Sequence, residues 1–408
     1  MQDKKKVLFE KSSIIMLLLF WLAIGIIVLT HKMNMYVIKN DYSFKLIGNE
    51  EITVLEGEEY VEQGVRILSR EGNNLSDYVN INNNVNINKI GTYIVKYNSK
   101  YNNIRKKITR KVNVVEKENI NRWIKIPSYD GSNEVTHPKV LYFEEGYSGY
   151  KYWMVNTPYP SNDAYYENPS IVVSNNGIDW VEPKGIKNPV SGYPNKVRDD
   201  SYYSDPFILY DSNKFEIFFR KTKSYLNGYY KRNGYNYIYY INSNDGIKYS
   251  EPKIIMKNNP NEQYMSMSVV KRDNVYKIWY VNYDGRIRYI ESKDLVEFAE
   301  PINVSINNFD KKIWHKEIQY VDNKYVCIFM IKYKLFYTES VDGINFSEPK
   351  EIDTKLKNID SNIYNIYKTS FVITDKYIEL FIPYRINYKW KMKYIKISKN
   401  DFYENMLQ

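Results

Sequence analysis

Cysteine is almost absent from this sequence of 408 residues, and so are dense runs of basic residues. The single Cys327 excludes a disulfide within the chain and a cysteine cluster for zinc; in the apolar run YVCIFMI it is expected to be a buried strand residue. Lys and Arg number 58 against 48 Asp and Glu, a net charge of +10, but no basic run interrupts the folded part. This argues against a nucleic-acid partner and leaves an acidic glycan, a lipid surface or a general lysine bias as explanations.

Charge is also missing from residues 14–30, the apolar run IIMLLLFWLAIGIIVLT, which follows Lys4, Lys5, Lys6 and Lys11. With the two preceding serines this run spans about 26–28 Å as a helix, near the lower limit for crossing a bilayer. No small-residue cleavage motif and no lipobox cysteine follows it, which disfavours the alternative of a cleaved signal peptide. We therefore predict that residues 1–35 form a cytoplasmic tail and an uncleaved transmembrane signal anchor, with the rest of the chain extracellular.

Residues 44–116 show short runs of alternating apolar and polar residues, broken by Gly and Asn, as in half-buried antiparallel strands. About 70 residues of this kind predict a small β-sandwich. The pieces EGEEYVEQGV, NKIGTYIVKYN and RKVNVV resemble the bacterial immunoglobulin-like repeats of surface proteins. This resemblance implies a spacer or an adhesive module, and the segment contains no cluster of chemically reactive residues.

One decapeptide pattern recurs four times after this segment: SNNGIDWVEP, SNDGIKYSEP, SKDLVEFAEP and SVDGINFSEP. Three short strand patterns precede each copy, and a fifth, less regular unit ends the chain. Such a period is typical of β-propeller blades, whose sheets bury their faces by stacking. The sequence therefore predicts an all-β chain with a five-bladed β-propeller at residues 123–408. Each decapeptide is expected to supply a tight turn and an aromatic residue, Trp180, Tyr249, Phe298 or Phe346, that packs between blades.

The first strand of each blade lines the channel of a propeller, and aligning these strands puts five polar residues at equivalent places: His137, Asp205, Ser266, His315 and Lys368. They could simply cap strands and contact channel water. Alternatively, they could form a site at the channel mouth.

Three carboxylates are candidates for acid–base chemistry at this mouth: Asp205, Glu167 and Glu317. Glu317 lies two residues after His315, so both side chains point the same way along a strand. Two carboxylates can hydrolyse a glycosidic bond. His137, His315 and Arg220 are expected to bind substrate; as an alternative, the two histidines and a carboxylate are suited to a divalent cation in the channel, although no cofactor is required.

Aromatic residues are abundant, with 43 Tyr and 7 Trp, and aromatic faces stack on sugar rings. Most are expected to pack between blades. Four near loops are predicted to contact substrate: Trp153, Tyr159, Tyr166 and Trp314.

Residues 134–350 resemble the five-bladed glycosidase propellers of the arabinanase, β-xylosidase and invertase type, through HPKV, SDPFI and the repeated decapeptide. The resemblance implies a general base Asp in blade one, an orienting Asp in blade two and a general acid Glu in blade three. Only Asp205, in blade two, matches; His137 replaces the base, and Ser266 and Met267 stand where the acid should be.

We therefore expect a membrane-anchored extracellular glycosidase-like protein that acts on cell-surface or environmental polysaccharide, with the acids relocated to Glu167 and Glu317. The alternatives are a non-catalytic glycan-binding protein and a scaffold for other envelope proteins.

Overall fold

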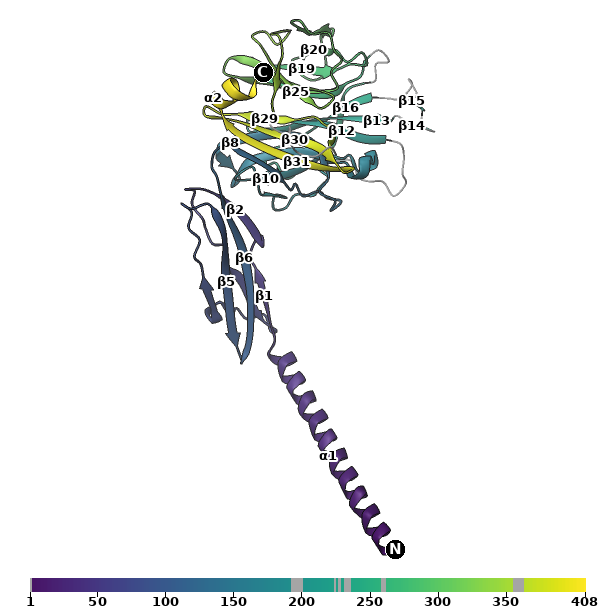
Figure 1. Ribbon diagram of the computed structural model, residues 1–408. Coiled ribbons are helices and arrows are strands. Elements are labelled where there is room, and N and C mark those ends of the chain that lie inside the picture. Colours follow the sequence, from purple (N-terminus) through teal and green to yellow (C-terminus); the bar gives the residue numbers. More distant parts are fainter. Residues whose placement is uncertain are drawn as a thin grey trace. The chain divides into compact units, whose positions relative to one another are not determined.

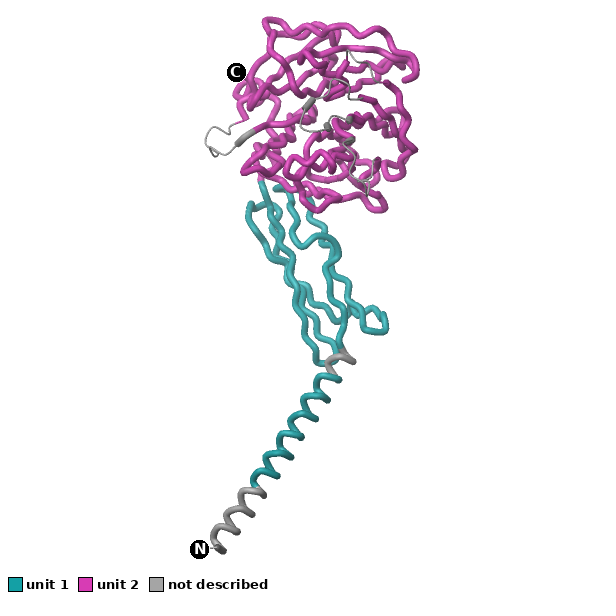
Figure 2. Tube along the Cα trace, turned by 90° about the vertical axis from the view of Figure 1, so that its right-hand side faces the viewer, with its two compact units in different colours: residues 1–115 teal, residues 116–408 magenta. Residues whose placement is uncertain are grey.

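The structure is a computed structural model that describes residues 2–191, 201–223, 225–226, 229–230, 236–257, 262–354 and 363–408. The chain divides into two compact units, residues 1–115 (unit 1) and residues 116–408 (unit 2), shown in Figure 2. The predicted all-β organisation is confirmed: an apolar helix comes first, a small sandwich follows it, and a propeller-like ring of sheets forms unit 2.

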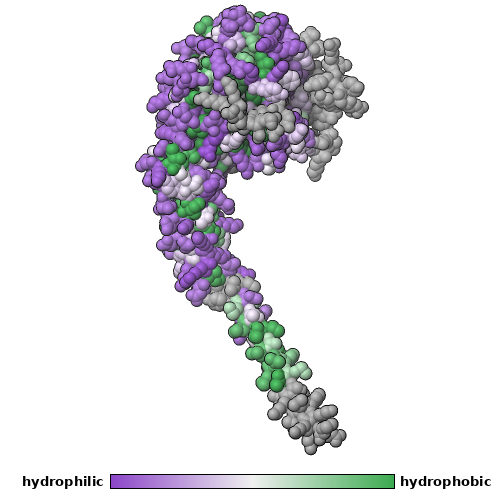
Figure 3. All heavy atoms as spheres, in the orientation of Figure 1, coloured by the Kyte–Doolittle hydropathy of each residue, from purple (hydrophilic) through white to green (hydrophobic). Residues whose placement is uncertain are grey.

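Unit 1 begins with the long helix α1 (Gln2–Asn40), whose stretch Ile15–Met35 is apolar and long enough to cross a membrane. The apolar side chains of this stretch are exposed, and Figure 3 shows them as a green band along the helix. Residues of this kind are normally buried in a soluble protein, so α1 has the character of a membrane anchor or a signal segment.

The rest of unit 1 is a sandwich of a two-stranded and a four-stranded sheet. In the larger sheet β2 and β6 run parallel, whereas β4, β5 and β6 are antiparallel. Alternate residues of β5 and β6 are buried, as the period-two pattern predicts, and Val95, Tyr97 and Val112 form the core. The elements are β1 (Tyr42–Leu46), β2 (Glu51–Leu55), β3 (Val65–Ser69), the 3₁₀ helix η1 (Ser76–Tyr78), β4 (Val79–Asn82), β5 (Gly91–Tyr101) and β6 (Ile104–Val115).

Among the described residues of unit 2, five antiparallel sheets have four or five strands, and four of these sheets follow the order of the chain; Figure 1 labels several of their strands. Sheet 1 is β8 (Val135–Tyr147), β9 (Tyr150–Pro158), β10 (Ser170–Ser174) and β11 (Trp180–Val181). Sheet 2 is β12 (Ser201–Asp211), β13 (Lys214–Lys223), β16 (Asn236–Ser243) and β17 (Lys253–Met256). Sheet 3 is β18 (Met265–Arg272), β19 (Val275–Val281), β20 (Ile287–Ser292) and β21 (Ile302–Asn303). Sheet 4 is β23 (His315–Val321), β24 (Lys324–Ile331), β25 (Lys334–Ser340) and β27 (Lys350–Ile352).

Sheet 5 joins the two ends of unit 2. It consists of β28 (Ile363–Ile366), β29 (Ser370–Ile373), β30 (Tyr377–Ile386) and β31 (Lys389–Ser398), and its outer strand is β7 (Ile120–Ile124). The sheet thus includes residues before 123, where the repeat pattern placed the start of the propeller. The first strands contact one another in cyclic order, β8 to β12, β18, β23, β29 and back to β8, so the ring is closed.

Short elements complete unit 2 between and after the sheets. They are η2 (Pro160–Asn162), η3 (Ala164–Tyr166), β14 (Tyr225–Leu226), β15 (Tyr229–Tyr230), β22 (Ser305–Ile306), β26 (Asn345–Phe346), α2 (Lys399–Asp401) and η4 (Phe402–Met406).

The repeated decapeptide forms the turn that follows the third strand of sheets 1 to 4. In sheet 4, Ser340 Oγ accepts a hydrogen bond from Gly343 N (2.9 Å), and Asp342 Oδ1 accepts from Ile344 N and Asn345 N (both 2.8 Å). Gly343 has φ +79°, and a Cβ added there would lie 2.8 Å from the ring of Trp279 in sheet 3. The turn therefore uses glycine because it must both adopt a left-handed conformation and press against the neighbouring sheet.

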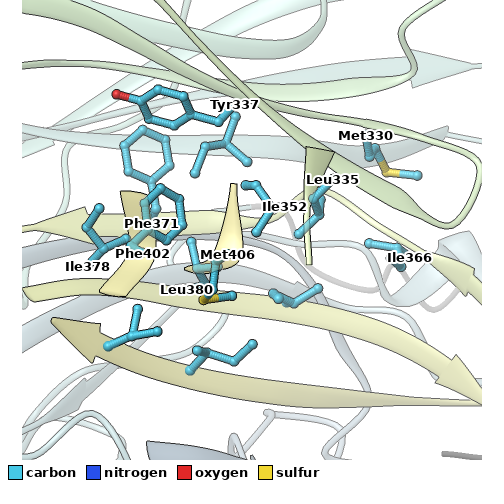
Figure 4. Packing of buried hydrophobic residues seen from close by; sticks show 14 of the residues in the cluster. Met330, Leu335, Tyr337, Ile352, Ile366, Phe371, Ile378, Leu380, Phe402 and Met406 are labelled. Atoms are coloured by element: carbon cyan, nitrogen blue, oxygen red, sulfur yellow. The ribbon is translucent and has the colours of Figure 1, made fainter. Parts of the chain in front are cut away.

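Hydrophobic clusters fill the spaces between adjacent sheets, as stacking of blades requires. The cluster between sheets 4 and 5, including Leu335, Ile352, Phe371 and Leu380, is shown in Figure 4. The aromatic residues of the decapeptides take part: Trp180 is buried and its ring lies 5.8 Å from that of Phe381 in sheet 5.

Candidate functional site

Three of the aligned polar residues stand on matching β-bulges. The register of the first strand shifts between Thr136 and Lys139 in β8, between Ser204 and Phe207 in β12, and between Met265 and Ser268 in β18. The bulged residues are His137, Asp205 and Ser266, with φ of +50°, +53° and +52°. A left-handed backbone conformation is unfavourable for residues other than glycine, and a bulge changes the direction of the side chain. Because both features recur at one level of the ring, this level is a candidate functional site.

Asp205 lies between two histidines at this level. Its Oδ1 is 3.3 Å from His137 Nε2 and 3.5 Å from His315 Nδ1. Its Oδ2 is 2.9 Å from Arg220 Nη2 and accepts a hydrogen bond from Ser204 Oγ at 3.2 Å. His137, Asp205 and His315 are buried, and one ligand atom from each lies within 4.8 Å of the others. Sheets 1, 2 and 4 therefore bring together three residues that are far apart in the sequence.

The free lone pairs of this group suit a metal ion. Within the described residues, His137 Nε2, Asp205 Oδ1 and both ring nitrogens of His315 have no hydrogen-bond partner. His137 Nδ1 lies 2.9 Å from Thr157 Oγ1, and donation of the Nδ1 proton to this oxygen leaves Nε2 as an acceptor. A histidine that binds a metal through one ring nitrogen normally donates a hydrogen bond from the other nitrogen, and this bond orients the ring. Two imidazoles and a carboxylate form a common ligand set for divalent transition-metal ions, so this group can bind a metal.

The electrostatic environment keeps the three side chains in the protonation states that a metal requires. Burial, opposed by Asp205 and assisted by Lys368 and Arg220, lowers the pKa of His137 to about 4. Burial likewise holds the pKa of His315 well below its usual value. Burial alone would raise the pKa of Asp205, but Arg220 and the two histidines keep it below the normal range. The histidines are thus neutral and the aspartate is ionised at neutral pH.

Glu167 is a second carboxyl group beside this centre. Its Oε1 is 3.8 Å from His137 Nδ1, and the side chain is buried. Burial, followed by the negative charge of Asp205, raises its pKa well above the usual value for a glutamate. This shift favours the protonated form of Glu167, which is the form that can donate a proton.

Glu317 belongs to a neighbouring group of buried charges. Its Oε1 is 3.2 Å from Lys139 Nζ and accepts hydrogen bonds from Ser370 Oγ (3.3 Å) and from the Gln319 side chain. Lys368 Nζ donates to Pro206 O at 3.0 Å, and burial lowers its pKa to about 8, partly offset by Glu317. Glu317 is thus buried with its Oε1 held by Lys139, whereas its Oε2 has no hydrogen-bond partner among the described residues.

The four predicted aromatic residues separate into two groups. Trp153 is fully buried between sheets 1 and 2, where its ring lies 4.9 Å from that of Phe215, so it is a core residue. Trp314 is 48% exposed and its ring lies 5.8 Å from that of His315. Tyr159 and Tyr166 are half-buried.

Tyr367 is a site residue that the sequence does not single out. Its half-buried ring lies 4.8 Å from that of His137 and 4.4 Å from that of His315, and it also contacts Tyr159 at 6.2 Å. Tyr367 therefore contacts both imidazoles and also the half-buried ring of Tyr159. Its position directly before the aligned Lys368 is the one signal in the sequence.

Comparison with known proteins identifies the sandwich. Residues 44–114 match the family model described as "Bacterial surface protein, Ig-like domain". A curated relative, the A type blood N-acetyl-alpha-D-galactosamine deacetylase of Flavonifractor plautii, is 46% identical over 71 residues, which are 17% of this chain and 9% of that protein. The chain therefore matches about a tenth of the relative. An Ig-like surface domain behind an apolar helix indicates a secreted or surface protein.

Unit 2 resembles carbohydrate-active enzymes in fold. The crystal structure of an N-acetylgalactosamine deacetylase from F. plautii, in complex with blood group B trisaccharide, matches with a TM-score of 0.58 at 21% identity, over 71% of this chain and 97% of that chain. The GH43 BlXynB protein of Bacillus licheniformis matches with a TM-score of 0.49 at 14% identity, over 65% and 55% of the chains. The fold of unit 2 is thus similar to that of the F. plautii deacetylase structure. The curated relative that matches the sandwich is also named a deacetylase.

Proposed function

We propose that unit 2 is a metal-dependent hydrolase that removes the acyl group from an N-acylated amino sugar in a glycan. The observation that carries the proposal is the convergence of His137, Asp205 and His315, with lone pairs unused by the described residues. A bound divalent ion would supply a Lewis acid and a water of lowered pKa, the chemistry needed to cleave an amide. The deacetylase activity of the F. plautii protein, which shares the fold, supports this choice of bond.

The surrounding residues have distinct roles in this proposal. Arg220 and Ser204 fix the orientation of Asp205, and Thr157 fixes the tautomer of His137. Glu167 lies beside His137, and its raised pKa favours the protonated form, which would donate a proton to the leaving amine. The exposed Trp314 offers a face on which a sugar ring can stack.

Hydrolysis of a glycosidic bond by two carboxylates is the second candidate. It is favoured by the raised pKa of Glu167, because a general acid must be protonated at the working pH. Against it, Oδ1 of Asp205 faces two imidazoles and Oδ2 is held by Arg220 and Ser204, which leaves neither oxygen directed at a sugar.

One experiment distinguishes these functions. The purified protein is treated with a chelator, reconstituted with Zn²⁺, Co²⁺ or Mn²⁺, and analysed for bound metal. It is then incubated with glycans bearing N-acetyl amino sugars while acetate and new reducing ends are measured in parallel. We expect about one metal per chain and acetate release that the chelator abolishes.

Asp205→Asn should lose both the metal and acetate release, whereas Glu317→Gln, a buried carboxyl change outside the ligand group, should retain the metal. Reducing ends formed in the presence of chelator would instead assign a glycosidase. Glycan binding without either product would assign a binding protein, and a wild-type chain that retains no metal would overturn the proposal.

We also propose that α1 stays in the membrane as a single-pass anchor with its N-terminus in the cytoplasm. The apolar stretch Ile15–Met35 and the lysines before it support this orientation. Membrane fractionation after alkaline carbonate washing, combined with the mass of the chain, tests it; a soluble chain shortened by about 35 residues would show cleavage instead.

A further inference from the structure

The outward face of the β5–β6 hairpin carries positive charges that the fold does not neutralise. Lys100 and Arg105 are directly opposite each other in the register, and Lys107 lies opposite Asn98 on the same exposed face. In the described part of the chain, none of these three cations has a carboxylate oxygen within 4.0 Å. Like charges placed opposite each other destabilise a sheet, so their arrangement is unfavourable for folding alone.

These cations line a groove of about 740 Å³ in the sandwich. Tyr78, which is 50% exposed, forms part of its wall and packs edge-to-face on Tyr101 at 4.9 Å. Asp77 is the one acidic residue that lines the groove, against Lys100, Arg105, Lys106 and Lys107. The groove therefore combines a net positive charge with an exposed aromatic ring, a pairing typical of protein surfaces that contact lipid headgroups.

The chain holds this hairpin close to the apolar helix. Lys106 Nζ lies 2.6 Å from Asp41 Oδ1, and its neighbours in the hairpin contact Tyr42: the rings of Tyr42 and Tyr101 are 6.1 Å apart. Asp41 comes six residues after Met35, the end of the apolar stretch. Six residues span about 9 Å as a helix and at most about 20 Å when extended. The hairpin is thus confined near the surface of any membrane that α1 crosses.

We propose that this basic groove binds the anionic headgroups of the membrane in which α1 is anchored. The groove is tethered where headgroup phosphates are concentrated, and attraction acts over a Debye length of about 8 Å at physiological salt. Each Lys or Arg near an anionic surface favours the bound state by about fivefold, so three of them favour docking by about a hundredfold. Docking through the sandwich would restrict the tilt of unit 1 on the membrane. The inference requires retention of α1 but does not depend on the activity of unit 2.

The test uses the full chain in lipid nanodiscs. Asn80 is exposed and lines the groove, and the natural Cys327 is buried, so a dye attached through Asn80→Cys labels the groove selectively. Energy transfer from this dye to headgroup-labelled lipid is compared in discs of phosphatidylcholine alone and in discs that contain phosphatidylglycerol. We expect stronger transfer in the anionic discs and its loss at high salt.

The triple variant Lys100→Gln, Arg105→Gln and Lys107→Gln should reduce the docked-to-undocked ratio by about a hundredfold. It should unfold at the same or a higher temperature than the wild type, because it removes opposed like charges. The matched control Lys184→Gln, Lys187→Gln and Lys253→Gln removes three exposed lysines from unit 2 and should leave the transfer unchanged.

Three results would overturn the proposal. One is equal energy transfer in neutral and anionic discs, and another is full docking of the triple variant. The third is displacement of the hairpin by millimolar glycerol phosphate, which would assign the groove to a soluble phosphate compound. A chain released from the membrane by cleavage of α1 would remove the premise, and the mass of the chain detects this separately.

Discussion

The depressed pKa values of the two histidines make a specific prediction about metal binding. A histidine with the ordinary pKa of about 6.5 is roughly 90% protonated at pH 5.5, which weakens its binding to a metal about tenfold. Two such ligands would lose about a hundredfold in affinity between pH 7.5 and pH 5.5. His137, with a pKa of about 4, is only a few per cent protonated at pH 5.5, and the pKa of His315 is also well below normal.

We therefore expect the affinity for Co²⁺ or Zn²⁺ to change less than about twofold between pH 7.5 and pH 5.5, and to fall steeply only near pH 4. The measurement is competition with a chelator of known protonation constants, followed for Co²⁺ by the visible absorption of the bound ion. Lys368→Met provides a second test. Because Lys368 lowers the pKa of both histidines, its removal should move the acid limb to higher pH.

A hundredfold loss of affinity by pH 5.5 in the wild type would refute this reasoning. It would mean that both imidazoles titrate as in water, and that the site is hydrated instead of buried.

Four further predictions follow from the same contacts. First, the metal-free protein should lose about 3 kcal/mol of stability between pH 6.5 and pH 4, since the unfolded chain takes up the proton of His137 before the folded chain does; chemical denaturation across this range measures it. Second, Thr157→Val should weaken metal binding by about 10–100-fold without changing the fold seen by circular dichroism, and unchanged affinity would separate Thr157 from the site. Third, Gly343→Ala should destabilise unit 2 by about 2–5 kcal/mol, through left-handed strain and the contact of the new Cβ with Trp279. Gly185→Ala, with φ +90° but a nearest neighbour at 3.7 Å, should cost only about 1–2 kcal/mol, so equal losses in urea unfolding would contradict the packing argument. Fourth, Trp314→Ala should raise KM for a glycan with little change in melting temperature, whereas Trp153→Ala should lower stability by about 3–5 kcal/mol; the reverse pattern would exchange their roles.

The site shows where inference from sequence succeeds and where it stops. Alignment of the repeats placed His137, Asp205 and His315 at one level, and these side chains do converge. The same reasoning grouped Glu317 with them, because alternation along a strand gives the direction of a side chain but not its partner. That partner is Lys139, on a strand of another sheet.

Tryptophans illustrate the same limit. Trp153 and Trp314 both lie near predicted loops, and their residue type gives no means to tell a core residue from a surface one. The stacking of sheets 1 and 2 buries Trp153, whereas Trp314 stays outside at the start of β23. Tyr367 was missed because it lies in the least regular repeat, between β28 and β29, where the alignment has no strand to follow.

The sequence by itself determined what depends on local pattern: the apolar helix, the alternating strands and the blade repeat. Hydrophobic periodicity specifies these because each residue responds to neighbours a few positions away. Tertiary structure alone decided which lone pairs remained free, which carboxylate an arginine or lysine held, and which histidines lost their charge. Those properties depend on burial and on distances of a few ångströms between separate sheets, and they appear only when the ring closes.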